Sequence, residues 1–127
     1  WRVAMARRVF AFADGAAESA GESLARVRMA EYGLPTPVLQ WVVVPPGSPG
    51  GGIRTDFGWP EAGVAGEFDG RSKYRDVDDL WDEREREQRL RDLGISVVRF
   101  TWDDVWRDFG RAAARLTAAL TSDRRAA

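Results

Sequence analysis

The chain contains no cysteine and no histidine among its 127 residues, and its single lysine is Lys73. Without cysteine there is no disulfide framework and no thiolate zinc site. Without histidine, the most common general base near neutral pH and most transition-metal sites are excluded as well. Any catalytic chemistry must therefore use carboxylates, arginines, hydroxyl groups, the one lysine and hard cations such as Mg²⁺.

Long apolar runs are also missing, so no stretch of the sequence is suited to crossing a membrane. The first residues, WRVAMARRVF, carry no signal-peptide cleavage pattern. Hydrophobic residues make up 44% of the chain and charged residues 31%, as in one ordinary globular domain. We expect a cytoplasmic protein with no membrane partner. The formal net charge is −1 and no segment is strongly basic, which predicts weak DNA affinity for this chain alone.

Turn signals and apolar patterns divide the chain into helices and strands in the order α-α-β-β-β-α-β-α. The predicted helices cover residues 1–13, 19–32, 80–93 and 111–120, and the predicted strands cover residues 38–44, 53–59, 64–69 and 95–100. The nearly continuous apolar run at 38–44 predicts a buried strand. We expect an α/β (α+β) domain whose mixed sheet of about four strands is flanked by helices. An antiparallel meander would be joined by one strand after a helical crossover.

The segment IRTDFGWPEAGVAGEFDG, residues 53–70, predicts a tight hairpin that gathers carboxylates. Pro60–Gly63 is turn chemistry between two short β-rich runs. A two-residue loop in the middle of that turn places Asp56 opposite Glu67, and opposed Cβ atoms lie about 5 Å apart. Side chains alternate between the two faces of a strand, so Glu67 and Asp69 share a face. Three acids are therefore expected to converge.

Like charges opposed across a strand pair destabilise the pair, so something must offset the repulsion. A divalent cation with oxygen ligands, Mg²⁺ or Mn²⁺, is the simplest candidate. The same spacing is also compatible with an acid that points to solvent, or with neutralisation of the group by Arg54 or Lys73.

The order of these parts resembles the PD-(D/E)XK nuclease superfamily, which has the restriction-endonuclease-like fold. An acid on one strand is followed by GEFDGRSKY, the charged helix EREREQRLRDLG and the strand SVVRFTW. The succession is similar to a group of small nuclease-like domains of high-GC bacteria, related to very-short-patch repair endonucleases, and extends from about Glu18 to Leu120. The resemblance implies a Mg²⁺-dependent DNA endonuclease domain at residues 17–127. Residues 1–16 would be a helical extension left from an upstream region.

The resemblance also implies roles for individual residues. Asp56 would be the central metal ligand, Glu67 the second ligand, and Glu22 the acid contributed by an early helix. Glu22 is equally explained as the last residue of an S-x-x-E capping box. Asp69 stands where the superfamily has lysine, so it is either a further ligand or a sign of lost activity. Lys73 either supplies the missing positive charge near the phosphate or is an exposed loop lysine. Further residues that could contact phosphate or support the ligands are Arg84, Gln88 and Arg99.

A second function fits the same sequence: a catalytically inactive nuclease-like module that binds DNA or a protein partner, for instance in a toxin–antitoxin-related protein. Asp69 in place of lysine favours this alternative, whereas the acids Asp56 and Glu67 favour the nuclease. The chain begins at Trp1 without an initiator methionine, which indicates a piece of a longer protein. The resemblance suggests an upstream DNA-binding or antitoxin-like domain.

Overall fold

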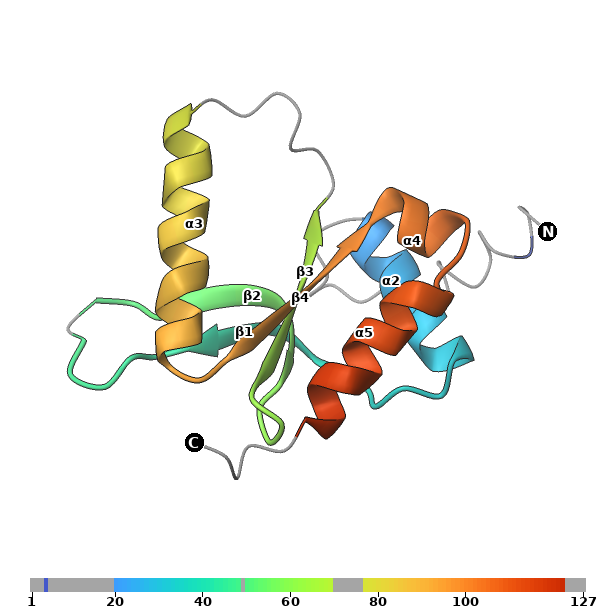
Figure 1. Ribbon diagram of the computed structural model, residues 1–127, viewed down its shortest axis with the longest axis horizontal. Coiled ribbons are helices and arrows are strands. Elements are labelled where there is room, and N and C mark those ends of the chain that lie inside the picture. Colours follow the sequence, from blue (N-terminus) through green and yellow to red (C-terminus); the bar gives the residue numbers. More distant parts are fainter. Residues whose placement is uncertain (1–3, 5–19, 49, 70–76, 123–127) are drawn as a thin grey trace.

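The structure, a computed structural model, describes residues 4, 20–48, 50–69 and 77–122. It contains a four-stranded mixed sheet flanked by helices, which confirms the expected fold class. Helix α3 lies on one side of the sheet, and α2, α4 and α5 lie on the other (Figure 1). The elements are α2 (Ala20–Glu31), β1 (Val38–Val43), β2 (Ile53–Trp59), β3 (Val64–Asp69), α3 (Val77–Asp92), β4 (Ser96–Thr101), α4 (Trp102–Trp106) and α5 (Gly110–Thr121).

Within the described residues, none of the helices has the length and apolar character needed to span a bilayer. The predicted helix at residues 1–13 and the cap at Ser19 lie outside the described part of the chain, apart from Ala4, which is helical.

The strands lie in the order β1-β2-β3-β4. Strands β1, β2 and β3 form the predicted antiparallel meander, and β4 runs parallel to β3 after the α3 crossover. The hairpin register is also confirmed, because Phe57 is paired with Gly66 and Trp59 with Val64. In the turn, the backbone N–H of Gly63 donates to the carbonyl of Pro60 at 3.0 Å.

The hydrophobic core lies between the sheet and the α2–α4–α5 layer. Phe100 of β4 packs edge-on against Phe57 of β2 and stacks on Phe109, with ring centroids 6.1 Å and 5.8 Å apart. Leu24 of α2 and Leu116 of α5 are buried in the same cluster. Most of the apolar area that stabilises the fold is therefore on this side of the sheet. The side facing α3 is left for polar groups.

Strand β1 is an edge strand and not the buried strand that its composition predicted. Val38 is 48% exposed and Val42 is 44% exposed. In the meander, β1 comes first and pairs only with β2 in the described sheet, so its other edge has no neighbouring strand there. The prediction failed because an apolar run indicates a strand but does not indicate its position in the sheet.

Helix α3 begins three residues before its predicted start at Leu80. Asp78 and Asp79, whose residue type predicts caps preceding the helix, lie inside its first turn, where the helix dipole favours acids. The sequence Thr101-Trp-Asp-Asp104 has the T-x-x-D spacing that predicts a helix cap, and Thr101 is the N-cap of α4. Its hydroxyl accepts from the N–H of Asp104 at 3.2 Å, and the Asp104 carboxylate accepts from the N–H of Thr101 at 2.9 Å.

Candidate functional site

Asp56 of β2 and Glu67 of β3 are neighbours, as the hairpin predicted, and we call them the carboxylate pair. The regular pairing of the two strands ends at Phe57 and Gly66, one position before the pair. Beyond that point the Oδ2 atom of Asp56 accepts a hydrogen bond from the backbone N–H of Phe68 at 2.8 Å. The side chain of Asp56 therefore takes the place of a backbone partner and is held in one orientation.

Glu67 is buried, with 8% of its surface exposed. Burial raises the pKa of Glu67 from 4.5 to about 7, because the charged form loses hydration. The nearby Arg86 lowers this pKa and Asp56 raises it, but burial has the largest effect. Glu67 thus takes up and releases a proton near neutral pH, a property that is common in catalytic carboxylates.

Arg86 reaches the carboxylate pair from α3. Its Nη2 atom lies 2.5 Å from Oε1 of Glu67 and also donates to the backbone carbonyl of Arg54. Its Nη1 atom lies 3.4 Å from Oε1 of Glu83. The sequence offered Arg54 or Lys73 as the neutralising cation, whereas the structure places Arg86 there.

A signal for Arg86 was present in the sequence. Glu83, Arg86, Glu87 and Leu90 are spaced i, i+3, i+4, i+7 and so share one side of a helix. Leu90 is the buried residue of α3, which identifies this side as the one that faces the sheet. The run DEREREQR contains no apolar residue, and for that reason its composition predicts a solvated helix face.

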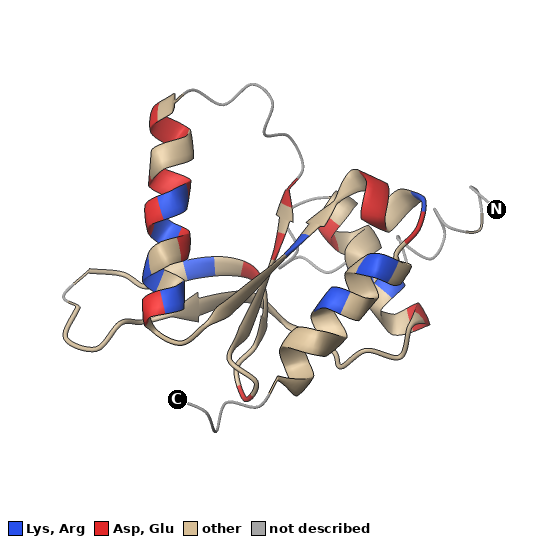
Figure 2. Ribbon diagram, viewed as in Figure 1, with Lys and Arg blue, Asp and Glu red and all other residues tan. Residues whose placement is uncertain are grey.

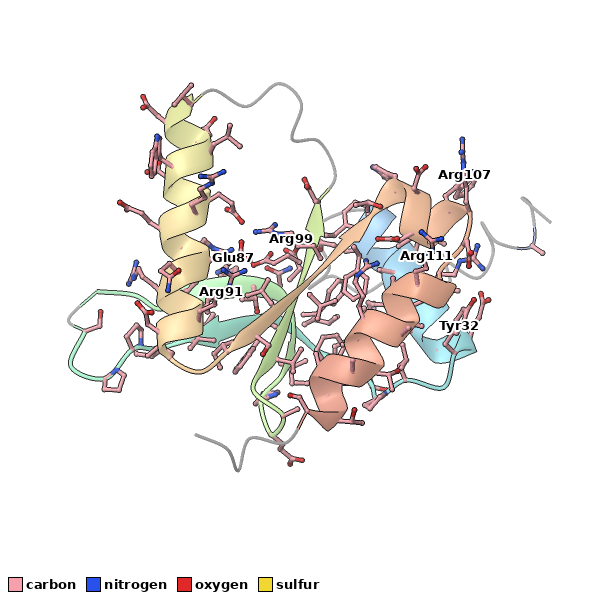
Figure 3. All side chains as sticks on the ribbon, viewed as in Figure 1. Tyr32, Glu87, Arg91, Arg99, Arg107 and Arg111 are labelled. Carbon is pink, nitrogen blue, oxygen red and sulfur yellow. The ribbon has the colours of Figure 1, made fainter. Side chains whose placement is uncertain are left out.

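Arg99 of β4 lies next to Glu67 in the parallel register of β3 and β4. Its Nη2 atom is 3.0 Å from both Oε1 of Glu83 and Oε2 of Glu87. Burial lowers the pKa of Arg99, but hydrogen bonds to these two carboxylates outweigh that effect and raise the pKa above its ordinary value. Figure 3 shows Arg99 and Glu87 in the space between β4 and α3. That Arg99 contacts phosphate or supports the ligands stays a prediction.

The side of the sheet that faces α3 therefore carries a connected set of charges, in which two arginines lie between the carboxylate pair and the acids of α3. Charges at such partly buried positions are costly unless they are paired, and these are paired across β3, β4 and α3. Figure 2 shows acidic and basic residues interspersed along α3. This surface is suited to a charged ligand rather than an apolar one. The groups, in order of contact, are Asp56, Glu67, Arg86, Glu83, Arg99 and Glu87.

Asp69 does not join the pair. Within residues 20–48, 50–69 and 77–122, no three carboxylates form a group that could hold a metal ion. The expected convergence of three acids is reduced to two, because β2 and β3 are no longer paired where Asp69 lies, beside Thr101 of β4. Its Oδ1 atom is buried and has no hydrogen-bond partner among the described residues.

Glu22 belongs to the opposite layer. Helix α2 packs on the Phe68 ring so closely that a Cβ on Gly21 would lie 2.1 Å from Cε1 of that ring. Phe68 and Glu67 are adjacent in β3 and point to opposite faces. Glu22 is 6% exposed and is engaged in an interaction within the protein. The expectation that Glu22 joins the two hairpin acids is therefore not met in this arrangement.

Two further predicted residues, both on α3, do not face the pair. Arg84 and Gln88 follow Glu83 and Glu87 by one position, so they turn to another side of α3. The side-chain amide of Gln88 donates to Asp92 at 2.9 Å on the surface. Lys73 lies outside the described residues.

Gln40 of β1 has an unusual backbone conformation and a buried polar side chain, neither of which the composition of the strand predicts. It lies opposite Asp56, between the pairs Leu39–Phe57 and Trp41–Thr55. Its φ is 51°, a left-handed conformation that is uncommon for residues with a side chain. Both its side-chain amide nitrogen and its amide oxygen are buried without a hydrogen-bond partner in the described part of the chain. Such features gather at functional sites, and the only hint in the sequence is one polar residue within VLQWVVV.

A groove of about 540 Å³ runs along the free edge of β4, next to the charged face. It contains two guanidinium groups, Arg99 and Arg115. The Nη2 atom of Arg115 donates to the Arg99 carbonyl at 3.0 Å and lies 3.1 Å from Oδ2 of Asp104. The lining residues are Glu87, Ser96, Val97, Val98, Arg99, Thr101, Arg115 and Ala119.

Comparison with known proteins gives relatives but no activity. The chain is similar to two uncharacterized proteins of Mycobacterium tuberculosis, one from strain CDC 1551 / Oshkosh and one from strain H37Rv. Each is 38% identical over 124 residues, which cover 98% of this chain and 45% of the relative. The chain therefore spans less than half the length of these relatives. No protein-family description matches it, and no solved structure matches it.

Proposed function

We propose that this chain is a Mg²⁺- or Mn²⁺-dependent DNA endonuclease domain that hydrolyses phosphodiester bonds in the cytoplasm. The observation that supports this proposal is the carboxylate pair, in which Asp56 and Glu67 from adjacent strands lie together and the pKa of Glu67 is raised to about 7. The arginines beside the pair would attract a phosphate.

The donors of the pair fit a hard divalent ion. Mg²⁺ is commonly held by one or two carboxylates, while waters and substrate phosphate oxygens fill the remaining positions. Two adjacent carboxylates are therefore sufficient protein ligands. Arg86 contacts Oε1 of Glu67, so this guanidinium has to move before that oxygen can bind a metal ion. Asp69, with its unpartnered Oδ1 in the described part of the chain, would become a further ligand if the strand end shifts.

Different residues of the chain would have different roles in hydrolysis. A bound divalent ion would supply charge neutralisation and an activated water. Asp56, fixed by the N–H of Phe68, would present its other oxygen to the ion. Glu67 would be the second ligand and would help to orient the attacking water. Arg99, and Arg86 once it is released from Glu67, would stabilise negative charge on the phosphate. Lys73 stays a proposed source of further positive charge.

A second function is favoured by one specific observation. Arg86 already neutralises Glu67, as a cation would do in a site that has lost its metal. Together with Asp69 at the position of the usual lysine, this favours a catalytically inactive module that binds DNA or a protein partner. The length of the relatives leaves room for a further domain, such as a DNA-binding or antitoxin-like domain.

Nicking of supercoiled plasmid separates the two functions. We expect cleavage with millimolar Mg²⁺ or Mn²⁺ and none with EDTA. Asp56→Asn and Glu67→Gln should each abolish cleavage, whereas Gln88→Ala, on the surface of α3, should cleave like the wild type. If the wild type does not cleave and its melting temperature does not respond to Mn²⁺, the nuclease proposal is wrong and the inactive module stands.

A further inference from the structure

The first half of α3 has no covering neighbour among the described residues. Val77 is 66% exposed, Leu80 is 47% exposed and Trp81 is 61% exposed. Every residue from Val77 to Asp82 is exposed, and the ion pairs between α3 and β4 are made by Glu83 and Glu87 in the second half of the helix. Figure 1 shows this end of the helix standing away from the sheet. Three large apolar side chains are therefore left in solvent.

These side chains lie on one side of the helix. Val77, Leu80 and Trp81 are spaced i, i+3, i+4, which places them next to one another along the axis. At 100° per residue, they are turned by roughly 120° from the side of α3 that carries Glu83 and Leu90 and faces the sheet. The described part of the domain cannot bury them against the sheet without giving up the ion pairs of Glu83. We call this surface the α3 stripe.

Acidic residues flank the α3 stripe. Asp78, Asp82 and Glu85 are spaced i, i+4, i+7 and form the adjacent side of the helix, whereas Asp79, four residues before Glu83, lies on the side that faces the sheet. Residues 77–82 contain three acids and no basic residue, and Arg84, at i+4 from Leu80 and i+3 from Trp81, follows at the C-terminal end of the stripe. Figure 2 shows acidic residues at this end of α3. The stripe is thus apolar at its centre and negatively charged along the side that carries Asp78, Asp82 and Glu85.

An exposed arrangement of this kind is typical of a binding surface. A helical segment whose side chains are all exposed is only marginally stable, so a partner that covers it would also stabilise the helix. Tryptophan is enriched among the residues that dominate protein–protein binding energy, and here two aliphatic side chains lie beside it. The acidic side of the stripe would repel nucleic acid phosphates and attract a basic protein surface.

We propose that the α3 stripe is a docking surface for a basic amphipathic helix of a protein partner. The apolar residues of that helix, spaced i, i+3, i+4, i+7, would pack on Leu80 and Trp81, and its lysines or arginines would face Asp78 and Asp82. This interaction is independent of the carboxylate pair, which lies on another side of α3 and uses different residues.

The test uses the full chain and two synthetic peptides of equal length. Both have leucines spaced i, i+3, i+4, i+7. The remaining positions are lysine in one peptide and glutamate in the other. By fluorescence anisotropy, the lysine peptide should bind at least about tenfold more tightly than the glutamate peptide. Trp81→Ala should weaken binding about tenfold or more, as for a central aromatic anchor. Trp106→Ala, another exposed tryptophan on a helix, should leave it unchanged.

A charge variant adds a second comparison. Asp78→Lys should weaken binding of the lysine peptide and reduce its dependence on salt, because screened attraction contributes to binding. Asp103→Lys changes an exposed acid in the first turn of α4 and should have no effect. Equal binding of both peptides, or undiminished binding by Trp81→Ala, would overturn the proposal. A concentration-dependent dimer of the chain that Trp81→Ala dissolves would also overturn it, because the occupant would then be a second copy.

Discussion

The guanidinium of Arg86 lies 2.5 Å from Oε1 of Glu67, so a cation from α3 already offsets the repulsion between Glu67 and Asp56. Acids on the two strands β2 and β3 therefore lie beside a base on helix α3. The contact ties the position of α3 to the protonation state of Glu67. Any ligand that binds the carboxylate pair must compete with Arg86.

Removing Arg86 should destabilise the protein in a pH-dependent way. Above about pH 8, Arg86→Met removes the cation that lowers the pKa of Glu67, so Glu67 must either stay charged without a partner or take up a proton, and we expect a loss of about 2 kcal/mol in the free energy of unfolding. Near pH 5 Glu67 is protonated in the folded state, so the loss should be much smaller. Urea denaturation at the two pH values measures the difference. Arg84→Met, a change on another side of the same helix, should show no such pH dependence.

The ionisation of Glu67 should lower the free energy of unfolding as the pH rises. Its pKa is 4.5 in the unfolded reference and about 7 in the folded state, so the folded state binds the proton more tightly. The resulting stabilisation is fully present below pH 4.5 and is lost as the pH rises to about 7, with a total of roughly 3 kcal/mol. Glu67→Gln should remove this component of the stability profile. A Glu67→Gln profile parallel to that of the wild type between these pH values would contradict the raised pKa.

Metal binding should be strengthened when Arg86 is absent. Mn²⁺ at millimolar concentration should raise the melting temperature of the wild type, since a ligand that binds only the folded state stabilises it. Arg86→Met should increase this shift because the competing cation is gone, and Asp56→Asn should abolish it. Differential scanning calorimetry with and without EDTA provides the measurement. A smaller Mn²⁺ shift in Arg86→Met than in the wild type would mean that Arg86 does not compete with the ion.

Gln40→Gly should stabilise the protein, although most glycine substitutions destabilise. The φ of Gln40 is 51°, which glycine adopts without steric cost, so we expect a gain of about 1 kcal/mol. Gln88→Gly is the matched control, because it lies inside α3 with ordinary helical geometry and should lose about 1 kcal/mol. Chemical denaturation of both variants gives the comparison. If both variants lose stability equally, the backbone at Gln40 is not strained in solution.

Local chemistry was sufficient to predict much of this fold. The register that pairs Phe57 with Gly66, and so brings Asp56 beside Glu67, follows from the turn at Pro60–Gly63 and the two-residue period of strands. The cap at Thr101 was likewise readable, because it depends on residues three positions apart. These features are set by contacts between residues that are close in sequence.

Features that depend on how distant elements pack were decided only by the tertiary structure. The apolar run of β1 forms an edge strand because the meander starts there, and composition does not encode strand order. Glu22 lies in α2, which packs on the face of the sheet opposite the carboxylate pair. Asp69 lies beyond the point where the pairing of β2 and β3 ends. Arg86 became the partner of Glu67 because one buried side chain, Leu90, determines which side of a highly charged helix faces the sheet. Residues 82–92 of that helix contain a single apolar residue, Leu90, which is too weak a pattern to fix the orientation from the sequence, since a helix is oriented by what it buries.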